Sequence, residues 1–184
     1  VPKFGFYGNA SIEDMERQVR TIIEGESIKE TDRFNVHFAR MGEPTWNENV
    51  LAFGLALKGI AKSAGLVAKT IHPVVSTMLP KANSKLGNFL QIWCSIKNEF
   101  YNGEAGLQLS INSTDDGQRS ELFSSRSLSL TEISRLADKL PMPVGRKYTL
   151  NFPVTAQTIL DARKLSELFR SEEHTSELQS PIDI

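Results

Sequence analysis

The tetrapeptide Met41-Gly42-Glu43-Pro44 combines the residue types in this sequence that are best suited to chemistry. It directly follows residues 35–40, a hydrophobic segment that reads as a strand and stops where glycine and proline break the pattern. A glycine at a strand end lets a ligand approach the backbone closely. A neighbouring carboxylate can accept charge-assisted hydrogen bonds from an ammonium group. The pattern suits an amino-acid ligand, and the alternative is a tight turn with a solvated glutamate.

Alternating strands and helices are expected to position this loop. Hydrophobic and β-branched segments predict strands at 35–40, 67–77, 107–112 and 147–154. Helical periodicity and capping residues predict helices at 12–24, 49–64, 84–100, 116–123, 131–140 and 156–169. This alternation indicates an α/β fold with a parallel sheet, either open and doubly wound or part of a βα barrel. Both architectures bind ligands at the carboxyl ends of their strands, which points to the loops at Met41, Thr77, Ser113 and Thr155.

The segment from Phe38 to Pro44 resembles the second-strand motif of radical S-adenosylmethionine (radical SAM) enzymes, in the form found in the branch related to the 23S rRNA adenine methyltransferases. Three further segments match that superfamily in order and spacing: Val75-Ser76-Thr77 with Pro80, residues 107–116 with Arg119, and residues 147–152 with Asn151. The resemblance covers residues 4–169. It implies a partial (βα) TIM-like barrel of the radical SAM type, truncated at both ends.

The resemblance also implies a reaction and its cofactors. A full-length parent would bind a 4Fe-4S cluster and S-adenosylmethionine, and would cleave the latter reductively to a 5'-deoxyadenosyl radical for hydrogen abstraction or methylation of an unknown substrate. A small electron donor such as flavodoxin or ferredoxin is implied as a partner. The residues implied to bind S-adenosylmethionine are Gly42 and Glu43 at its amino group, Ser76 at its carboxylate or ribose, Ser110 and Asn112 at the ribose-carboxylate side, and Asn151 near the adenine or ribose.

The chain departs from the family at the metal site. The defining CxxxCxxC motif is absent, and Cys94 is the one cysteine, so no set of thiolates in this chain can hold a cluster. Because residues 4–9 resemble the stretch that follows the third cysteine of that motif, we expect the cluster cysteines upstream of Val1. We therefore expect no metal ligands in this chain, and we expect the fragment alone to be inactive.

Two further departures weaken the likeness to the RNA methyltransferases. Asn112 stands where those enzymes carry histidine, and residues 124–126 replace their M-P-[IV]-N segment. Cys94 matches neither the methyl-carrying nor the resolving cysteine, and is expected to be a packed helix residue. RNA thus stays open as a substrate, but these residues give no evidence for it.

The end of the chain differs in character from the rest. Residues 170–180 read RSEEHTSELQS, which resembles the conceptual translation of a common sequencing-library adapter. We therefore expect residues 1–169 to form a partial radical SAM core, and residues 170–184 not to be native. His174 is accordingly not expected to have a functional role.

Composition narrows the class of protein. With 184 residues, 40% of them hydrophobic and 23% charged, the chain is expected to form one soluble domain. The formal charge of −1 gives no sign of a nucleic-acid partner. No apolar run is long enough to span a membrane, and the first residues do not form a signal peptide, which predicts a cytoplasmic protein without membrane association.

Two other functions stay open. The first alternative is a cluster-free βα-barrel enzyme in which Glu43 acts as a general acid or base. The second is a non-catalytic binding module that uses the same barrel. His37 is expected to be a hydrogen-bonded residue in a strand covered on both faces. The substrate and the oligomeric state are not indicated by these residues.

Overall fold

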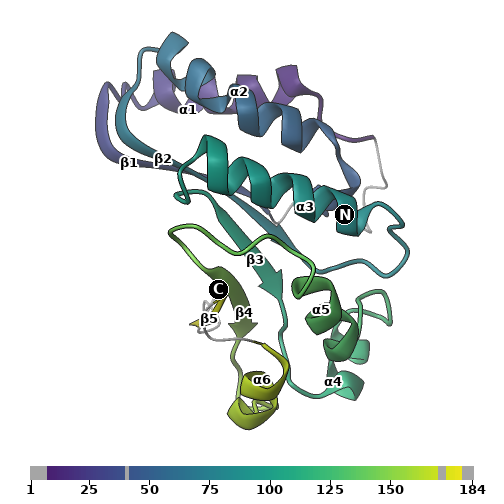
Figure 1. Ribbon diagram of the computed structural model, residues 1–184. Helices are drawn as coiled ribbons and strands as arrows, with labels where there is room; N and C mark the ends of the chain where they lie inside the picture. The colour runs from purple at the N-terminus through teal and green to yellow at the C-terminus, as the bar shows by residue number, and fades with distance from the viewer. Residues whose placement is uncertain (1–7, 40–41, 170–172, 180–184) are drawn as a thin grey trace.

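The computed structural model describes residues 8–39, 42–169 and 173–179. Its sheet has five parallel strands in the order β1-β2-β3-β4-β5. The strands are β1 Glu30–Phe38, β2 Val67–Thr77, β3 Gly106–Ser110, β4 Tyr148–Pro153 and β5 His174–Gln179. The helices are α1 Ile12–Gly25, α2 Asn49–Ser63, α3 Leu86–Ser95, α4 Asp116–Leu122, α5 Leu130–Ala137 and α6 Ala162–Leu168, with the short turns η1 Pro44–Trp46 and η2 Ile96–Phe100 (Figure 1).

Local sequence signals account for where several helices begin. Ser11 and Asp14 form a capping box at the start of α1, and Ser129 and Glu132 form another at the start of α5. Met15, Val19 and Ile23 recur at helical spacing in α1 and are buried, whereas Ile22 is exposed. Because each helix has one apolar stripe, it must lie against another apolar surface to remove that stripe from water.

The sheet supplies that surface on one face only. Val75, Leu107 and Leu109 project to this face and are at most 1% exposed. They form one core with buried residues of α1, α2, α3 and α5. Figure 1 shows α1, α2 and α3 side by side along this face. Helices on a single face follow from the strand order, because each right-handed connection between neighbouring parallel strands carries its helix to the same side.

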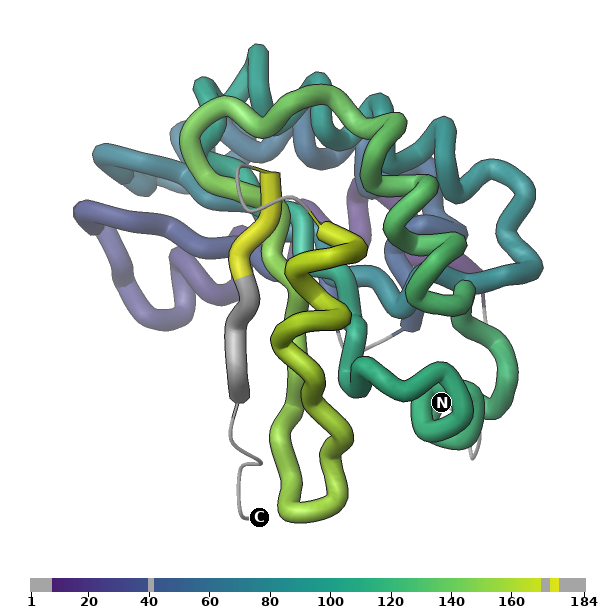
Figure 2. The backbone as a smooth tube through the Cα atoms, turned by 60° about the horizontal axis from the view of Figure 1, so that its bottom comes forward, coloured from purple at the N-terminus to yellow at the C-terminus, as the bar shows by residue number. Residues whose placement is uncertain are grey.

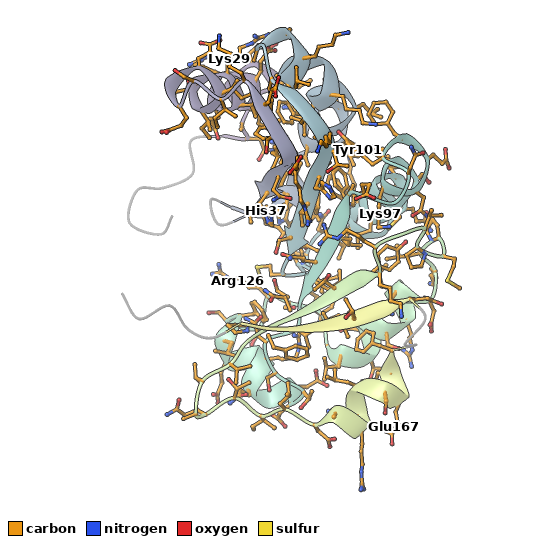
Figure 3. The ribbon with its side chains drawn as sticks, turned by 90° about the vertical axis from the view of Figure 1, so that its left-hand side faces the viewer. Lys29, His37, Lys97, Tyr101, Arg126 and Glu167 are labelled. Atoms are coloured by element: carbon orange, nitrogen blue, oxygen red, sulfur yellow. The ribbon has the colours of Figure 1, made fainter. Side chains whose placement is uncertain are left out.

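The strands change direction markedly across the sheet. Figure 3 shows β1 and β2 running steeply while β4 and β5 lie nearly crosswise to them. Figure 2 shows β5 beside β4, with the chain of residues 154–168 returning along the same strand. The loops of the sequence motifs lie at the carboxyl edge of this twisted sheet.

The predicted alternation of strands and helices is confirmed, and the strand at 67–77 has the bounds of β2. The strand order does not reverse among the described strands, whereas a doubly wound sheet requires such a reversal. None of the helices in the described part of the chain is long and apolar enough to cross a membrane. Residues 174–179, for which a foreign origin was expected, pair with β4 as an edge strand.

Three predictions of detail were wrong. The first strand begins at Glu30, and β3 ends at Ser110 rather than at residue 112. The helix predicted at 156–169 begins only at Ala162, because Asp161 caps it through the amides of Arg163 and Lys164. Residues 155–161 instead form a turn that is hydrogen-bonded to the loop after β3.

The expectation that His37 is covered on both faces was also wrong. Its side chain is exposed, on the side of the sheet away from Lys97 and Tyr101, which lie among the helices (Figure 3). His37 pairs in register with Val74, so it shares the face opposite the helical core.

Candidate functional site

The loop after β1 carries the first two predicted site residues. Gly42 adopts φ +111°, a conformation that a residue with a Cβ rarely takes, and nothing lies within 4 Å of the position a Cβ would occupy. The glycine is therefore required by the backbone conformation, and the space beside it is open. Met41 and Arg40 lie outside the described residues.

Glu43 is held in place by three hydrogen bonds. Its Oε1 accepts from the backbone amide of Thr45 at 3.2 Å and from the Thr45 hydroxyl at 2.7 Å, which caps η1. Its Oε2 accepts from the backbone amide of Met78 at 2.9 Å. Two ionised carboxylate oxygens offer about four acceptor positions, so these bonds leave roughly one position on Oε2 for a further donor. The carboxylate is thus a fixed acceptor that joins the loops after β1 and β2.

The loop after β2 is shaped by buried polar contacts. Thr77 accepts a hydrogen bond from the amide of Leu79, a buried residue with φ +57°. The left-handed conformation is unfavourable for leucine. It is maintained because Leu79 is fully buried in the core and its carbonyl accepts from the amide of Leu128. This turn brings the Met78 amide to Glu43.

The ends of β3 and β4 hold the other predicted residues. Ser110 and Asn151 are neighbours in register. The Asn151 carbonyl accepts from the amides of Ile111 and Asn112, and Asn112 has φ +62°. Asparagine tolerates this conformation better than most residues do. The Asn151 Oδ1 is buried and has no hydrogen-bond partner within the described residues. A buried acceptor without a partner calls for an explanation, and a donor supplied by a ligand is one.

The predicted residues Ser76, Ser110 and Asn151 share one face of the sheet. The register aligns Ser76 with Gln108, Gln108 with Thr149, and Ser110 with Asn151. Since side chains of one strand alternate between faces while neighbours in register share a face, these five residues project to the same side. It is the side of His37, opposite the helical core (Figure 3). All three predicted residues are half-buried.

The structure therefore gathers the six predicted residues at one edge of the sheet. Gly42 and Glu43 follow β1, Ser76 lies near the end of β2, Ser110 ends β3, Asn112 follows it, and Asn151 lies in β4. The bond from the Met78 amide to Glu43 links the loops after β1 and β2. The bonds from the Ile111 and Asn112 amides to the Asn151 carbonyl link the end of β3 to β4.

Arg119 is a site residue to which the sequence assigned no role. It lies in α4 and is 2% exposed. Its Nη1 donates to the carbonyls of Ser110 and Ile111 at the end of β3, and its Nη2 donates to the Ser127 hydroxyl and the Leu128 carbonyl. Burial lowers the pKa of Arg119 to about 10, and the carboxylate of Asp116 counters this in part, so the guanidinium stays charged at neutral pH. Ser127 had no sequence signal at all.

Cys94 and Lys97 lie away from this site, among the helices. Cys94 is fully buried in α3, as expected for a packed helix residue. Burial raises the pKa of the Cys94 thiol to about 11. A buried neutral thiol is a poor nucleophile and a poor metal ligand. Within residues 8–39, 42–169 and 173–179, no three His, Cys, Asp or Glu side chains gather to form a metal site.

A cavity of about 840 Å³ lies elsewhere, on the outer surface of the helices. Leu55, Ile92 and Phe100 line it together with polar residues of α3 and the segment after α5. None of the six predicted residues contributes to it. Because its polar groups belong to solvated helix surfaces rather than to strand ends, we assign the chemistry to the carboxyl edge of the sheet.

The edge can hold a small ligand that carries hydrogen-bond donors. The Glu43 carboxylate offers a fixed negative acceptor with a free position. The Asn151 Oδ1 offers a buried neutral acceptor near the hydroxyl-bearing Ser110. Such a pair suits a molecule with an ammonium group at one end and hydroxyl groups further along.

Comparison with known proteins adds no relative from which a function could be transferred. No family model matches this chain, and no curated protein matches it in sequence.

Proposed function

We propose that this chain is part of a radical SAM enzyme, and that the carboxyl edge of its sheet binds S-adenosylmethionine. The observation that carries the proposal is the pair of available acceptors, the Glu43 carboxylate and the Asn151 Oδ1, at the ends of strands that also carry Ser76 and Ser110. S-adenosylmethionine presents an ammonium group at its methionine end and hydroxyl groups on its ribose. The acceptors match those donors in kind.

The arrangement of the sheet supports a barrel as the parent fold. Neighbouring parallel strands follow in sequence order, and the helices of the core lie on one face. Closing such a sheet would make the opposite face, with Ser76, Gln108 and Asn151, the interior of a (βα) barrel. Active sites of such barrels lie at the carboxyl ends of the strands.

A 4Fe-4S cluster would supply the electron for reductive cleavage of S-adenosylmethionine in the parent. The described residues do not fit this group, because they offer no set of ligands for it. Its cysteines would come from outside this chain, and its electron from a donor such as flavodoxin or ferredoxin. The part of the reaction that this chain supplies is to bind and orient S-adenosylmethionine. Glu43 would hold the ammonium group, and the serine hydroxyls with Asn151 would hold the ribose.

A ligand titration tests the binding site directly. The chain is titrated with S-adenosylmethionine by calorimetry or NMR, and the Glu43→Gln variant is compared with wild type. Loss of a hydrogen bond between charged groups, worth about 1.5–3 kcal/mol, predicts a dissociation constant at least about tenfold higher. Glu48→Gln is the matched control, because Glu48 lies in the same region but forms an exposed pair with Lys85.

The result decides between the proposals. Equal affinity of wild type and Glu43→Gln, or no binding by wild type, would remove S-adenosylmethionine as the ligand of this edge. Thermal unfolding of both variants must be measured alongside, because Glu43 also joins two loops. A Glu43→Gln chain that binds weakly but unfolds like wild type would support a direct contact.

The cluster is tested on the longer parent. The coding sequence before Val1 is read from the parent DNA, and the extended protein is reconstituted anaerobically with iron and sulfide. A CxxxCxxC triplet together with bound iron would support radical chemistry. Without such a triplet, the cluster-free barrel enzyme and the non-catalytic binding module would remain.

A further inference from the structure

Arg119 is an unusual residue to bury, because its charge is not neutralised by direct contact with a carboxylate. Among the described residues its one carboxylate partner is Asp116, whose Oδ1 lies 4.0 Å from Nε. The hydrogen-bond partners of the guanidinium are instead neutral oxygens, including the carbonyl of Ser110. Burying a charged group is unfavourable unless its hydrogen bonds are made. Arg119 makes them through Nη1 and Nη2 to segments that meet at the candidate site, whereas its buried Nε has no hydrogen-bond partner within the described residues.

Hydrogen bonds that meet at the backbone of Met78 connect Arg119 to Glu43. Arg119 Nη2 donates to the Ser127 hydroxyl at 2.9 Å, and this hydroxyl donates to the carbonyl of Met78 at 2.6 Å. The amide of Met78 then donates to Glu43 Oε2 at 2.9 Å. The Ser127 hydroxyl has one hydrogen to donate, and the Met78 carbonyl at 2.6 Å is a nearer acceptor for it than the Leu128 carbonyl at 3.3 Å. Arg119 can only donate, so the hydroxyl oxygen accepts from it.

The same guanidinium holds the end of β3. Its Nη1 donates to the carbonyls of Ser110 and Ile111, and the Ile111 amide donates to the carbonyl of Asn151. One side chain therefore connects the end of β3 with the loop after β2 and, through Met78, with the carboxylate after β1. These are the segments that carry the two halves of the proposed binding site.

We infer that Arg119 and Ser127 are positioning residues that fix the distance between the Glu43 carboxylate and the Ser110–Asn112 segment. The inference rests on the proposed function, in which Glu43 holds the ammonium end of S-adenosylmethionine and Ser110 holds the ribose side. A ligand that spans both halves gains affinity over its separate parts only when the halves are held at the matching distance. Loosening the connection should remove that gain and leave each half intact.

The test compares the whole ligand with its parts. Dissociation constants are measured for S-adenosylmethionine, for methionine and for adenosine, in wild type and in Ser127→Ala. We expect Ser127→Ala to weaken S-adenosylmethionine about five- to tenfold, the effect of one net hydrogen bond. Methionine and adenosine should each change less than twofold. Ser127→Thr keeps the hydroxyl and should restore most of the affinity for the whole ligand.

A matched control is available in the same loop. The hydroxyls of Ser120 and Ser125 bond to each other at 2.8 Å on the surface, and this bond is not among those that connect Arg119 to Glu43. Ser125→Ala should therefore leave all three dissociation constants unchanged. Amide hydrogen exchange gives a second readout: Ser127→Ala should speed exchange at Met78 without affecting Leu150 in β4.

The outcomes separate the two proposals. If wild type binds none of the three ligands, the proposed function fails and this inference fails with it. If wild type binds S-adenosylmethionine but Ser127→Ala weakens the whole ligand and its parts equally, or weakens none of them, the positioning role is refuted while the binding site stands.

Discussion

The buried amine of Lys97 predicts an unusual dependence of stability on pH. Lys97 is fully buried at the start of η2, where Nζ donates to the Val144 carbonyl at 2.6 Å and the Asn98 side chain at 3.3 Å. The ring of Tyr148 lies 5.8 Å from the amine. Desolvation lowers the pKa of Lys97 from 10.5 to about 8, an effect that nearby Cys94 opposes in part.

The sign follows from proton binding. Below pH 8 the folded and unfolded chains both carry the proton, so the full penalty of the buried charge is present. Between pH 8 and 10.5 the unfolded chain binds more protons than the folded chain, so stability rises with pH. At about 1.36 kcal/mol per pKa unit, the stability contributed by Lys97 should rise by roughly 3 kcal/mol across this window.

The assay is urea unfolding from pH 7 to 10.5, with Lys97→Met compared against its parent. Both proteins carry Cys94→Ala, because the raised pKa of Cys94 would make stability fall as pH rises. The titration of the tyrosines is common to both and cancels in the difference. Lys97→Met should be the more stable protein at pH 7, and its advantage should shrink by roughly 3 kcal/mol by pH 10.5.

A flat difference over this range would refute the reasoning, since it would mean that the amine titrates alike in both states. Lys58→Met is the matched control. Lys58 is exposed and lies over the rings of Phe100 and Tyr101. The difference in free energy of unfolding between Lys58→Met and its parent should therefore not change by roughly 3 kcal/mol between pH 7 and 10.5. A similar slope for Lys58→Met would assign the effect to charge removal in general.

Three substitutions test the local energetics, each by urea or thermal unfolding. Gly59→Ala should stabilise the chain by up to about 1 kcal/mol, because Gly59 is exposed in α2 and nothing lies within 4 Å of an added Cβ; a loss of stability would contradict this. Gly103→Ala should destabilise by roughly 2 to 3 kcal/mol, because its φ is +84° and its Cβ would lie 2.3 Å from the Val144 carbonyl oxygen. An unchanged midpoint would show that the two loops separate freely. Ser11→Ala should cost about 1 kcal/mol through loss of the capping box with Asp14, and a neutral effect would show that α1 is held by packing alone.

Sequence patterns predicted those elements whose signals are local. The capping box at Ser11 marks the start of α1, and the β-branched run at 67–77 has the bounds of β2. These signals work because backbone hydrogen bonds and side-chain conformations of one segment depend on its own residues. The helix predicted from residue 156 was wrong because the turn at 155–161 bonds instead to the loop after β3, more than forty residues away.

Some residues of the candidate site could likewise be recognised from the sequence, and others only from the structure. A glycine and a glutamate after a strand could be recognised from the residues alone, because parallel strands bring their carboxyl ends to one edge. The exposed position of His37 could not, since the sequence does not reveal which face the helices leave open. The unpartnered Asn151 Oδ1 likewise became visible only when the neighbouring side chains were in place.

By itself the sequence determined the alternation of strands and helices, the strand end that carries Gly42 and Glu43, and the burial of Cys94. Only the tertiary structure decided that Glu43 accepts from Met78, a residue 35 positions away, and that Arg119 is buried against the end of β3. The physical reason is that these contacts join segments whose positions are set by the register of the sheet and the packing of the core, which no single segment encodes.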